Sequence, residues 1–329
     1  MKLKINDARA LAIGALLSLK FSKEDATVTA DHLIDAALRG VTFGSLPRIL
    51  AIAEKMRDVG DQRKPISTVR ETDTSAVIDG GDNVGYVVAH HATRIAIEKA
   101  KVHGIGMVGA NNTFYTGLFS YYLEMATREG LVAFAVGNGP AKVAPEGAAE
   151  GRLGTNPIAF GFPSEGDPVI WDIGTCAVMH GDVMLHRRMG KELPEGVALD
   201  SNGQPTTDAE AAMSGFIRTW GGHRGSGLAV VVQMLCALAG GPVISPGWRE
   251  MAYFMIVIDP KVFLPGGEYP ARISELAAEI SSARPIDPTR PVRMPFERSA
   301  TDRRSSLESG FVEIPDIVYE GLIKLKGDA

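Results

Sequence analysis

Three closely spaced glycines constrain the fold of this chain more than any other feature of its sequence. Gly104, Gly106 and Gly109 have the spacing G-x-G-x-x-G. In Rossmann-type domains a strand ends at the first glycine of this pattern and a helix begins at the last, so that the helix amino terminus meets phosphate. Here a helical pattern at 89–103 precedes the glycines and a short apolar run at 105–110 follows them. The pattern therefore predicts a helix-to-strand connection that does not bind phosphate.

The other segments predict a mixed α/β fold outside the Rossmann class. Helices and strands alternate without the regular βαβ spacing of a doubly wound sheet. The segments expected as strands are short and apolar: around 76–78, 105–110, 131–138, 156–163, 168–174 and 253–259. The segments expected as helices are two within 1–40, the second starting at Ser22, and those at 89–103, 119–130, 227–239 and 314–325. The helix at 227–239 is apolar nearly all round, so we expect it to be buried.

Length and composition indicate a soluble globular protein of about two domains. The chain has 329 residues, of which 45% are hydrophobic and 22% are charged. A net charge of −5 provides no basic surface for nucleic acid. The apolar stretch after Lys4 resembles the start of a secretory signal, but Asp7 and Arg9 intervene and the stretch is too short to span a bilayer. We therefore expect an amphipathic helix there and no membrane partner.

The cysteines and histidines of the sequence indicate neither disulfides nor a metal. Cys176 and Cys236 are far apart in apolar sequence, which fits a protein of the reducing cytoplasm. His90 and His91 are adjacent on a predicted helix and point about 100° apart, so they do not share a metal easily. Because no HExxH motif and no Cys/His cluster occurs, we expect no metal site.

Two short segments contain candidate binding residues. "GGHRGSG" precedes the helix at 227–239, where the first N–H groups of the helix, with His223 and Arg224, can hold an anion. A tight turn that packs the helix is the alternative. In "FGSLPR", Arg48 follows a glycine turn and can bind a carboxylate in a bidentate manner, although a solvated surface arginine has the same pattern.

Taken in order, several motifs resemble the malate/L-lactate dehydrogenase type 2 family. They are "LGTNPIAFGFP", "WDIGTCAVMHGDV", "LPEGVALDSNGQPTTD" and "GGHRGSGLAVVVQMLCALAGG", and the likeness covers about residues 10 to 325. The resemblance implies an NAD(P)-dependent reductase of small 2-oxo or cyclic 2-imino acids, a non-Rossmann fold and a homodimer. It also implies a discontinuous two-domain plan, in which 116–255 bind the cofactor while 1–115 and 256–329 form a substrate and dimerisation domain.

The resemblance assigns the cofactor to specific positions of this sequence. They lie in the segments "NGP", "GTNP", "WDIG", "GGHRG" and "PFE": Gly139, Thr155, Asp172, Ile173, Gly174, His223, Arg224, Gly225, Pro295, Phe296 and Glu297. Arg224 replaces the lysine of the family's "GGHKG" and keeps its positive charge.

The catalytic positions depart from the family pattern. The family's "SHG" contains its usual proton donor, and "TFG" here has Phe43 in that place. The family's "NSxHxG" contains a second histidine, where "NNTFYTG" offers Asn112 or Thr113. Because phenylalanine cannot donate a proton, the donor would be Tyr115, His180 or a bound water.

These departures leave alternatives open. A cyclic imino acid that arrives as protonated C=N⁺ accepts hydride without an acid from the enzyme. A non-redox enzyme, or a pseudo-enzyme that binds a dinucleotide or a small acid on the same fold, is the other class of function.

Overall fold

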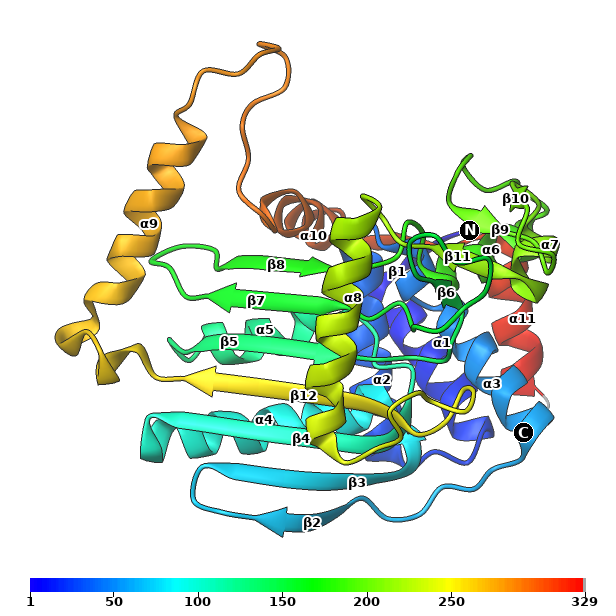
Figure 1. The fold of residues 1–329 in the computed structure, drawn as a ribbon, viewed down its shortest axis with the longest axis horizontal. Helices are drawn as coiled ribbons and strands as arrows, with labels where there is room; N and C mark the ends of the chain where they lie inside the picture. The colour runs from blue at the N-terminus through cyan, green and yellow to red at the C-terminus, as the bar shows by residue number, and fades with distance from the viewer. Residues whose placement is uncertain (328–329) are drawn as a thin grey trace.

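The computed structural model describes residues 1–327 and contains a mixed seven-stranded sheet (Figure 1). The strand order is β2-β3-β4-β12-β5-β7-β8. The bounds are β2 (Ser67–Glu71), β3 (Ser75–Val84), β4 (Ile105–Phe114), β12 (Met251–Ile258), β5 (Val132–Gly137), β7 (Ile158–Phe162) and β8 (Val169–Ile173). β3 and β4 pair in parallel, and the other neighbours in this sheet pair antiparallel. The predicted mixed α/β class is therefore confirmed.

The three spaced glycines join a helix to a strand, as predicted. Gly104 ends α4 (Gly85–His103) in the left-handed conformation, with φ of 80°, and β4 follows. A β-carbon at Gly106 would lie 2.0 Å from the carbonyl oxygen of Ala96, and one at Gly109 would lie 2.8 Å from a backbone atom on the opposite face. The glycines thus let helices approach β4 closely, which is a packing role.

Helices cover both faces of the sheet. α4 and α5 (Phe119–Thr127) pack on one face over a core that includes Tyr122 and Tyr253. α8 (His223–Cys236) packs on the other face over a smaller cluster. Figure 1 shows α8 crossing in front of the strands, with α4 and α5 behind them.

The outer side of α8 is exposed, so the expectation that this helix is buried is wrong. Val231 is 49% exposed and Met234 is 68% exposed, and Leu238, in the short 3-10 turn η2 (Ala237–Ala239) that follows, is 62% exposed. A helix lying on a sheet presents one stripe to it. The apolar residues on the other side of α8 therefore stay uncovered in this chain.

The two ends of the chain form a helical layer beside the sheet (Figure 1). Its helices are α1 (Ile5–Ser18), α2 (Lys23–Leu38), α3 (Pro47–Val59) and α11 (Asp316–Gly327). β1 (Lys2–Lys4) pairs antiparallel with β13 (Phe311–Glu313). Ser22 caps α2 by accepting a hydrogen bond from the Asp25 amide at 3.0 Å, which confirms the predicted helix start. No helix within residues 1–327 is long and apolar enough to cross a membrane.

Three strands of a smaller sheet come from the segment between β8 and α8, and its fourth strand comes from earlier in the chain. Its order is β10-β9-β11-β6. The elements of this region are β6 (Val143–Ala144), α6 (His180–Met189), β9 (Ala198–Leu199), β10 (Pro205–Thr206), α7 (Ala209–Ser214) and β11 (Phe216–Arg218). α6 matters for the site because its first residue, His180, is buried.

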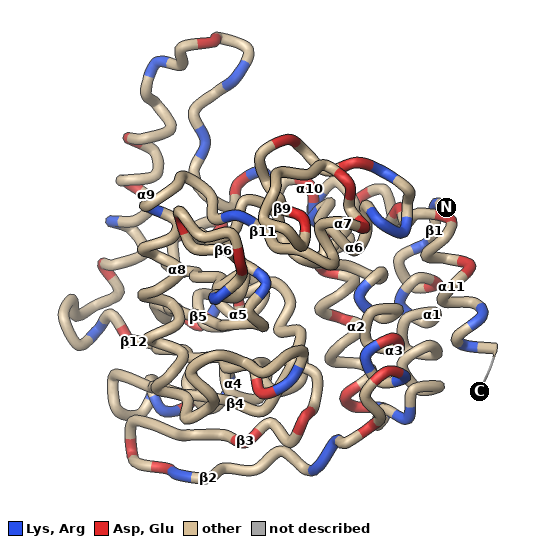
Figure 2. The backbone as a smooth tube through the Cα atoms, turned by 45° about the vertical axis from the view of Figure 1, so that its right-hand side comes forward, with Lys and Arg blue, Asp and Glu red and all other residues tan. Residues whose placement is uncertain are grey.

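An arm projects from the body of the molecule (Figure 1). It consists of α9 (Glu268–Ser281) and the segment that leads to α10 (Glu297–Ser309). No residue of α9 is buried, and Leu276 on it is 53% exposed. Figure 2 shows acidic and basic residues interspersed along the chain.

The predicted division into two domains stays a prediction. The seven-stranded sheet contains strands from both 1–115 and 116–255. β12 crosses the proposed boundary at residue 255, so the sheet joins the two parts.

Candidate active site

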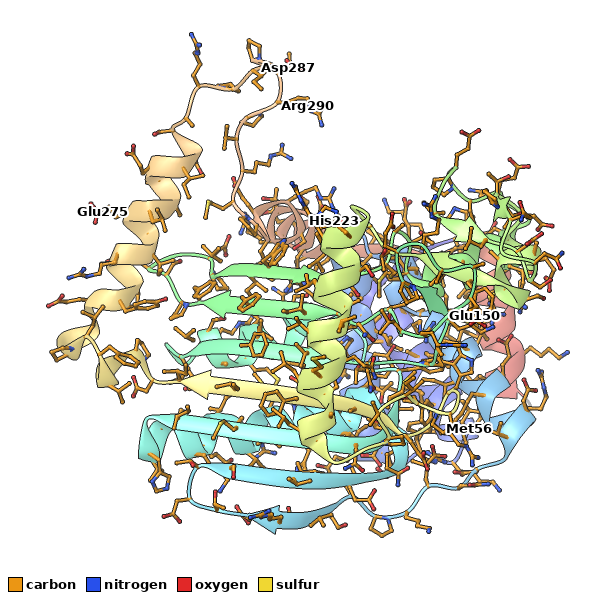
Figure 3. The ribbon with its side chains drawn as sticks, viewed as in Figure 1. Met56, Glu150, His223, Glu275, Asp287 and Arg290 are labelled. Atoms are coloured by element: carbon orange, nitrogen blue, oxygen red, sulfur yellow. The ribbon has the colours of Figure 1, made fainter. Side chains whose placement is uncertain are left out.

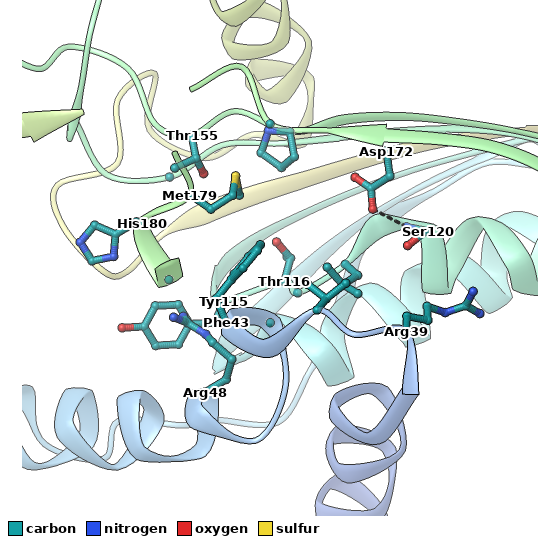
Figure 4. A pocket seen from close by; sticks show the side chains of 18 of the residues that line it. Arg39, Phe43, Arg48, Tyr115, Thr116, Ser120, Thr155, Asp172, Met179 and His180 are labelled. Atoms are coloured by element: carbon teal, nitrogen blue, oxygen red, sulfur yellow. Dashed lines mark hydrogen bonds between the residues drawn. The ribbon is translucent and has the colours of Figure 1, made fainter. Parts of the chain in front are cut away.

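A cavity of about 480 Å³ lies between the sheet and the helical layer (Figure 4). Its size is within the roughly 300–1,000 Å³ typical of small-molecule sites. The lining comes from Tyr86 and from segments far apart in the sequence, within 39–48, 115–120, 138–142, 155–157, 170–181, 248–251 and 294–299. Its charged side chains among the described residues are Arg39, Arg48, Lys142, Asp172 and Arg298. Cations therefore predominate, with Asp172 the single carboxylate in this set.

Arg48 lies in the first turn of α3 and is 9% exposed. Its guanidinium carbon is 4.1 Å from the centre of the Tyr115 ring, and Nη1 is 3.8 Å from Sδ of Met184. No carboxylate within residues 1–327 pairs with it. Because a buried charge without a counter-ion is costly, this cavity favours an anionic ligand beside Arg48.

His180 lies next to Arg48 at the same end of the cavity. A β-carbon at the following residue, Gly181, would lie 3.1 Å from Nη1 of Arg48 and 3.3 Å from Cδ2 of Phe43. The His180 ring is 4.3 Å from that of Trp248, and its Nδ1 is buried without a hydrogen-bond partner among the described residues. Burial, together with the positive charges around it, lowers the pKa of His180 to about 3.

The loop after β4 carries Tyr115 into the cavity. Tyr115 has a φ of 55°, a strained value for a bulky residue that is often found at functional sites. His32 of α2 fixes this loop, because its Nε2 accepts a hydrogen bond from the Leu118 amide at 2.9 Å. Burial raises the pKa of Tyr115 and of Tyr86, so both phenols stay protonated at neutral pH.

Asp172 lies at another part of the cavity, in β8 (Figure 4). Its Oδ2 accepts the Ser120 amide at 2.7 Å, at the amino-terminal turn of α5, where the helix dipole favours negative charge. Burial nevertheless raises the pKa of Asp172 to about 6, because the helix does not fully replace water around the carboxylate.

The cofactor residues implied by the resemblance fall into two groups. Those that line the cavity are Gly139, Thr155, Asp172, Gly174, Pro295 and Phe296. Those outside its lining are Ile173, His223, Arg224, Gly225 and Glu297. A β-carbon at Gly139 would have its nearest neighbour at 3.6 Å, so a ligand can approach the backbone there. Glycines, aromatic surfaces and the nearby Arg298 are the features that the rings and phosphates of a dinucleotide require.

The start of α8 lies outside the cavity. Gly222 precedes the helix with a φ of 61°, and His223 and Arg224 are exposed at this end of it, where Figure 3 labels His223. A β-carbon at Gly225 would lie 2.0 Å from the carbonyl oxygen of Trp220, so this glycine allows close packing. The turn packs the helix, and its exposed cations stay accessible to an anion.

Among the catalytic candidates, Phe43, Arg48 and Tyr115 line the cavity, whereas Asn112 and Thr113 do not. Both belong to β4, and their side chains bond elsewhere. Asn112 donates to Oδ1 of Asp79 at 2.8 Å, and Thr113 donates to the carbonyl oxygen of Asn83 at 2.7 Å.

Sequence reasoning missed several cavity residues. Tyr86, Lys142 and Trp248 had no motif that singled them out, because each lies in a segment whose place in the fold depends on distant contacts. Lys142 lies only three positions after Gly139, and its closeness to that predicted residue is the one signal that could have found it.

Comparison with known proteins places this chain among dehydrogenases. The family model for malate/L-lactate dehydrogenase matches residues 3–323. A malate dehydrogenase of Pyrococcus horikoshii is 35% identical over 288 residues, which cover 83% of this chain and 80% of that protein. A Delta(1)-pyrroline-2-carboxylate reductase of Burkholderia ambifaria is 30% identical and covers 98% of this chain and 97% of its own. A dehydrogenase from Sinorhizobium meliloti has a similar structure, with a TM-score of 0.90 and 28% identity over 99% of this chain and 98% of that one.

Proposed function

The chain belongs to the malate/L-lactate dehydrogenase family, and from this premise we propose that it transfers a hydride between NAD or NADP and a small 2-oxo, 2-hydroxy or cyclic 2-imino carboxylate. As a member of this family it is a dehydrogenase or reductase. The malate dehydrogenase and the pyrroline-2-carboxylate reductase among its relatives represent both substrate classes. The proposal therefore extends to a carbonyl or an imine next to a carboxylate.

The observation that supports this proposal best is the unpaired Arg48. Its guanidinium is buried in the cavity and has no carboxylate partner among the described residues. A substrate carboxylate would supply the missing charge through a bidentate pair, for which arginine has the matching geometry. Phe43 and Trp248, which line the same end, would exclude water from the reacting carbon.

The cofactor would contact the cavity residues that the substrate does not contact. The bound nicotinamide supplies or accepts the hydride. Gly139 leaves the backbone accessible, and Asp172 provides a hydrogen-bond acceptor whose charge varies near neutral pH. Arg298, beside Phe296, would meet a phosphate. The same proposal includes a contact between the cofactor and Arg224 at the start of α8.

The test begins with binding and proceeds to turnover. NADH and NADPH are titrated into the purified protein, and binding is followed by fluorescence. Oxidation of the bound nucleotide is then measured with pyruvate, oxaloacetate and the cyclic imines of proline and pipecolate. Turnover of any of these by wild type, with loss in Arg48→Met, supports the proposal. Dinucleotide binding without turnover across the panel favours the pseudo-enzyme, and absence of nucleotide binding excludes the proposal.

We propose further that the protein is a homodimer. Apolar side chains are exposed on two surfaces. Val231 and Met234 lie on α8, and Leu276 lies on the projecting arm. Two copies related by a two-fold axis would cover such surfaces reciprocally. Light scattering at micromolar concentration should give about twice the 35.0 kDa of one chain, and Met234→Glu should shift the mass toward one chain. A strict monomer for the wild type would contradict the proposal.

The proposed compartment is the cytoplasm. Cys176 and Cys236 are both free and buried, which fits a reducing environment.

A further inference from the structure

We propose that His180 donates the proton to carbonyl substrates, at the end of the cavity where Phe43, which cannot donate one, also lies. This inference rests on the proposed function, since it assigns a donor to that reaction. The residue comes from α6, a different element from the one that contains Phe43. The proton donor would thus lie at the same end of the cavity as Phe43 but on a different element of the chain.

The position of His180 relative to Arg48 is the first argument. A β-carbon at Gly181, the residue that follows His180, would lie 3.1 Å from Nη1 of Arg48 and 3.3 Å from the ring of Phe43. The Arg48 charge also acts on the His180 ring. In a 2-oxo acid the carbonyl carbon is bonded directly to the carboxylate carbon. A carboxylate held by Arg48 therefore presents its carbonyl oxygen beside the residues that surround Arg48. Of these, His180 has a ring nitrogen without a partner.

The packing of the ring is the second argument. His180 is 8% exposed and lies against Trp248, with ring centres 4.3 Å apart. A buried polar atom without a hydrogen bond costs free energy, so native proteins rarely keep one without a use. Nδ1 of His180 is such an atom among the described residues, and a substrate oxygen would satisfy it.

The charges around His180 explain how its ring would gain a proton when the substrate binds. Burial of the ring lowers its pKa most, and the charges of Arg48, Lys142 and Arg187 lower it further, so the ring is neutral in the free protein at neutral pH. Asp182, two positions along α6, faces His186 instead. Binding of an anion would compensate the charge of Arg48 and bring a negative group beside the ring. The pKa of His180 would then rise, and the ring would take up a proton together with the substrate.

The chemistry balances for both substrate classes. With a 2-oxo acid, the carbonyl carbon accepts the hydride that reduced NAD(P) supplies, and the π pair moves onto oxygen. That oxygen takes the proton from the His180 imidazolium, which leaves a 2-hydroxy acid, oxidised dinucleotide and neutral His180. With a protonated cyclic imine the π pair moves onto a nitrogen that already carries its proton. The protein then supplies none.

The first experiment compares the two substrate classes in one variant. His180→Gln should lower kcat for the 2-oxo acid by about 10²–10⁴-fold, the usual contribution of a general acid, while imine reduction keeps most of its rate. His186→Gln, on the same helix but outside the cavity lining, is the matched control and should leave both rates unchanged. Equal losses for both substrates in His180→Gln would mean a structural role and overturn the inference. Loss of 2-oxo reduction in Tyr115→Phe, with His180→Gln active, would assign the donor to Tyr115.

The second experiment needs no turnover. Oxalate, an unreactive analogue of a 2-oxo acid, is titrated into wild type and His180→Gln by calorimetry in buffers of different ionisation enthalpy at pH 7. Wild type should take up as much as about one proton per oxalate bound, whereas His180→Gln should bind oxalate without that uptake. Oxalate binding without proton uptake in wild type would overturn the inference. If wild type reduces no carbonyl or imine, the proposed function fails, and this proton count still decides whether His180 responds to an anion.

Discussion

Two buried arginines line the same cavity and differ in their partners. Arg39 is 4% exposed and pairs with Asp35 at 2.6 Å and with Glu124 at 2.5 Å, leaving only Nη1 without a bond. Arg48 is 9% exposed and pairs with no carboxylate within residues 1–327. Figure 4 shows the two on different sides of the cavity.

The difference separates a structural charge from a functional one. The charge of Arg39 is compensated within the chain, where it connects α2 to α5 and stacks on Phe296 with 4.6 Å from its guanidinium carbon to the ring centre. The charge of Arg48 is compensated only when a ligand brings an anion. Burial alone therefore does not identify a binding residue, and the absence of an internal partner is the more informative observation.

Replacement of Arg48 should have the largest effect, and it should appear in activity. Arg48→Met is expected to lower kcat/KM by about 10²–10³-fold, or roughly 3–4 kcal/mol, because a buried charge pair with the substrate is lost. Stability should not fall, since the variant removes a buried charge without a partner. Steady-state kinetics and thermal unfolding measure the two effects. Unaltered kinetics would mean that the substrate carboxylate binds elsewhere.

Replacement of Arg39 should have the opposite signature. Arg39→Met is expected to lower the free energy of unfolding by about 3 kcal/mol, the low end for a broken buried pair. The loss is limited because Arg303 still pairs with Asp35 and Arg128 still pairs with Glu124. Chemical denaturation measures the loss, and Arg39→Lys is the control that keeps the charge. If Arg39→Met were as stable as wild type but inactive, the comparison between the two arginines would fail.

Arg224 provides an exposed cation for comparison with both. Arg224→Ala is expected to weaken NAD(P)H binding by about ten- to hundredfold, the value of a charge-assisted phosphate contact of roughly 1.5–3 kcal/mol. The fold should be unaffected, because Arg224 is exposed and forms no ion pair with residues 1–327. Fluorescence titration with each nucleotide is the measurement. Unchanged affinity would move the phosphate contact to another cation, such as Arg298.

The two sides of the cavity should also respond oppositely to pH. The folded-state pKa of His180 is depressed to about 3, so its contribution to stability is present above pH 6.5 and is lost as the pH falls, by about 1.4 kcal/mol per unit. The folded-state pKa of Asp172 is raised to about 6, so its contribution is present below pH 3.8 and is lost as the pH rises through 6. Denaturation at pH 6.5 and 5 should show a smaller loss on acidification in His180→Gln than in wild type, and a larger one in Asp172→Asn. Parallel pH curves for all three proteins would contradict both assignments.

Much of the fold was predictable because its signals are local. The apolar runs identified six of the seven strands of the large sheet, whereas β2, whose residues are all exposed, has no such run. Ser22 followed by Asp25 identified the start of α2. The arginine of "FGSLPR" was predictable as a candidate for the same reason, since a glycine turn before an arginine is visible in the sequence. The exposure of α8 was not predictable, because an apolar helix has the same composition whether its own chain or another surface covers it.

The sequence by itself determined that Gly104, Gly106 and Gly109 join a helix to a strand, because helix periodicity and left-handed glycine are properties of a few neighbouring residues. Only the tertiary structure decided what surrounds each arginine. One partner of Arg39 is 85 residues away in the chain, and Gly181 lies against Phe43 although more than a hundred positions separate them. Whether a buried charge has a counter-ion depends on which distant segments the fold brings together, and no local pattern contains that information.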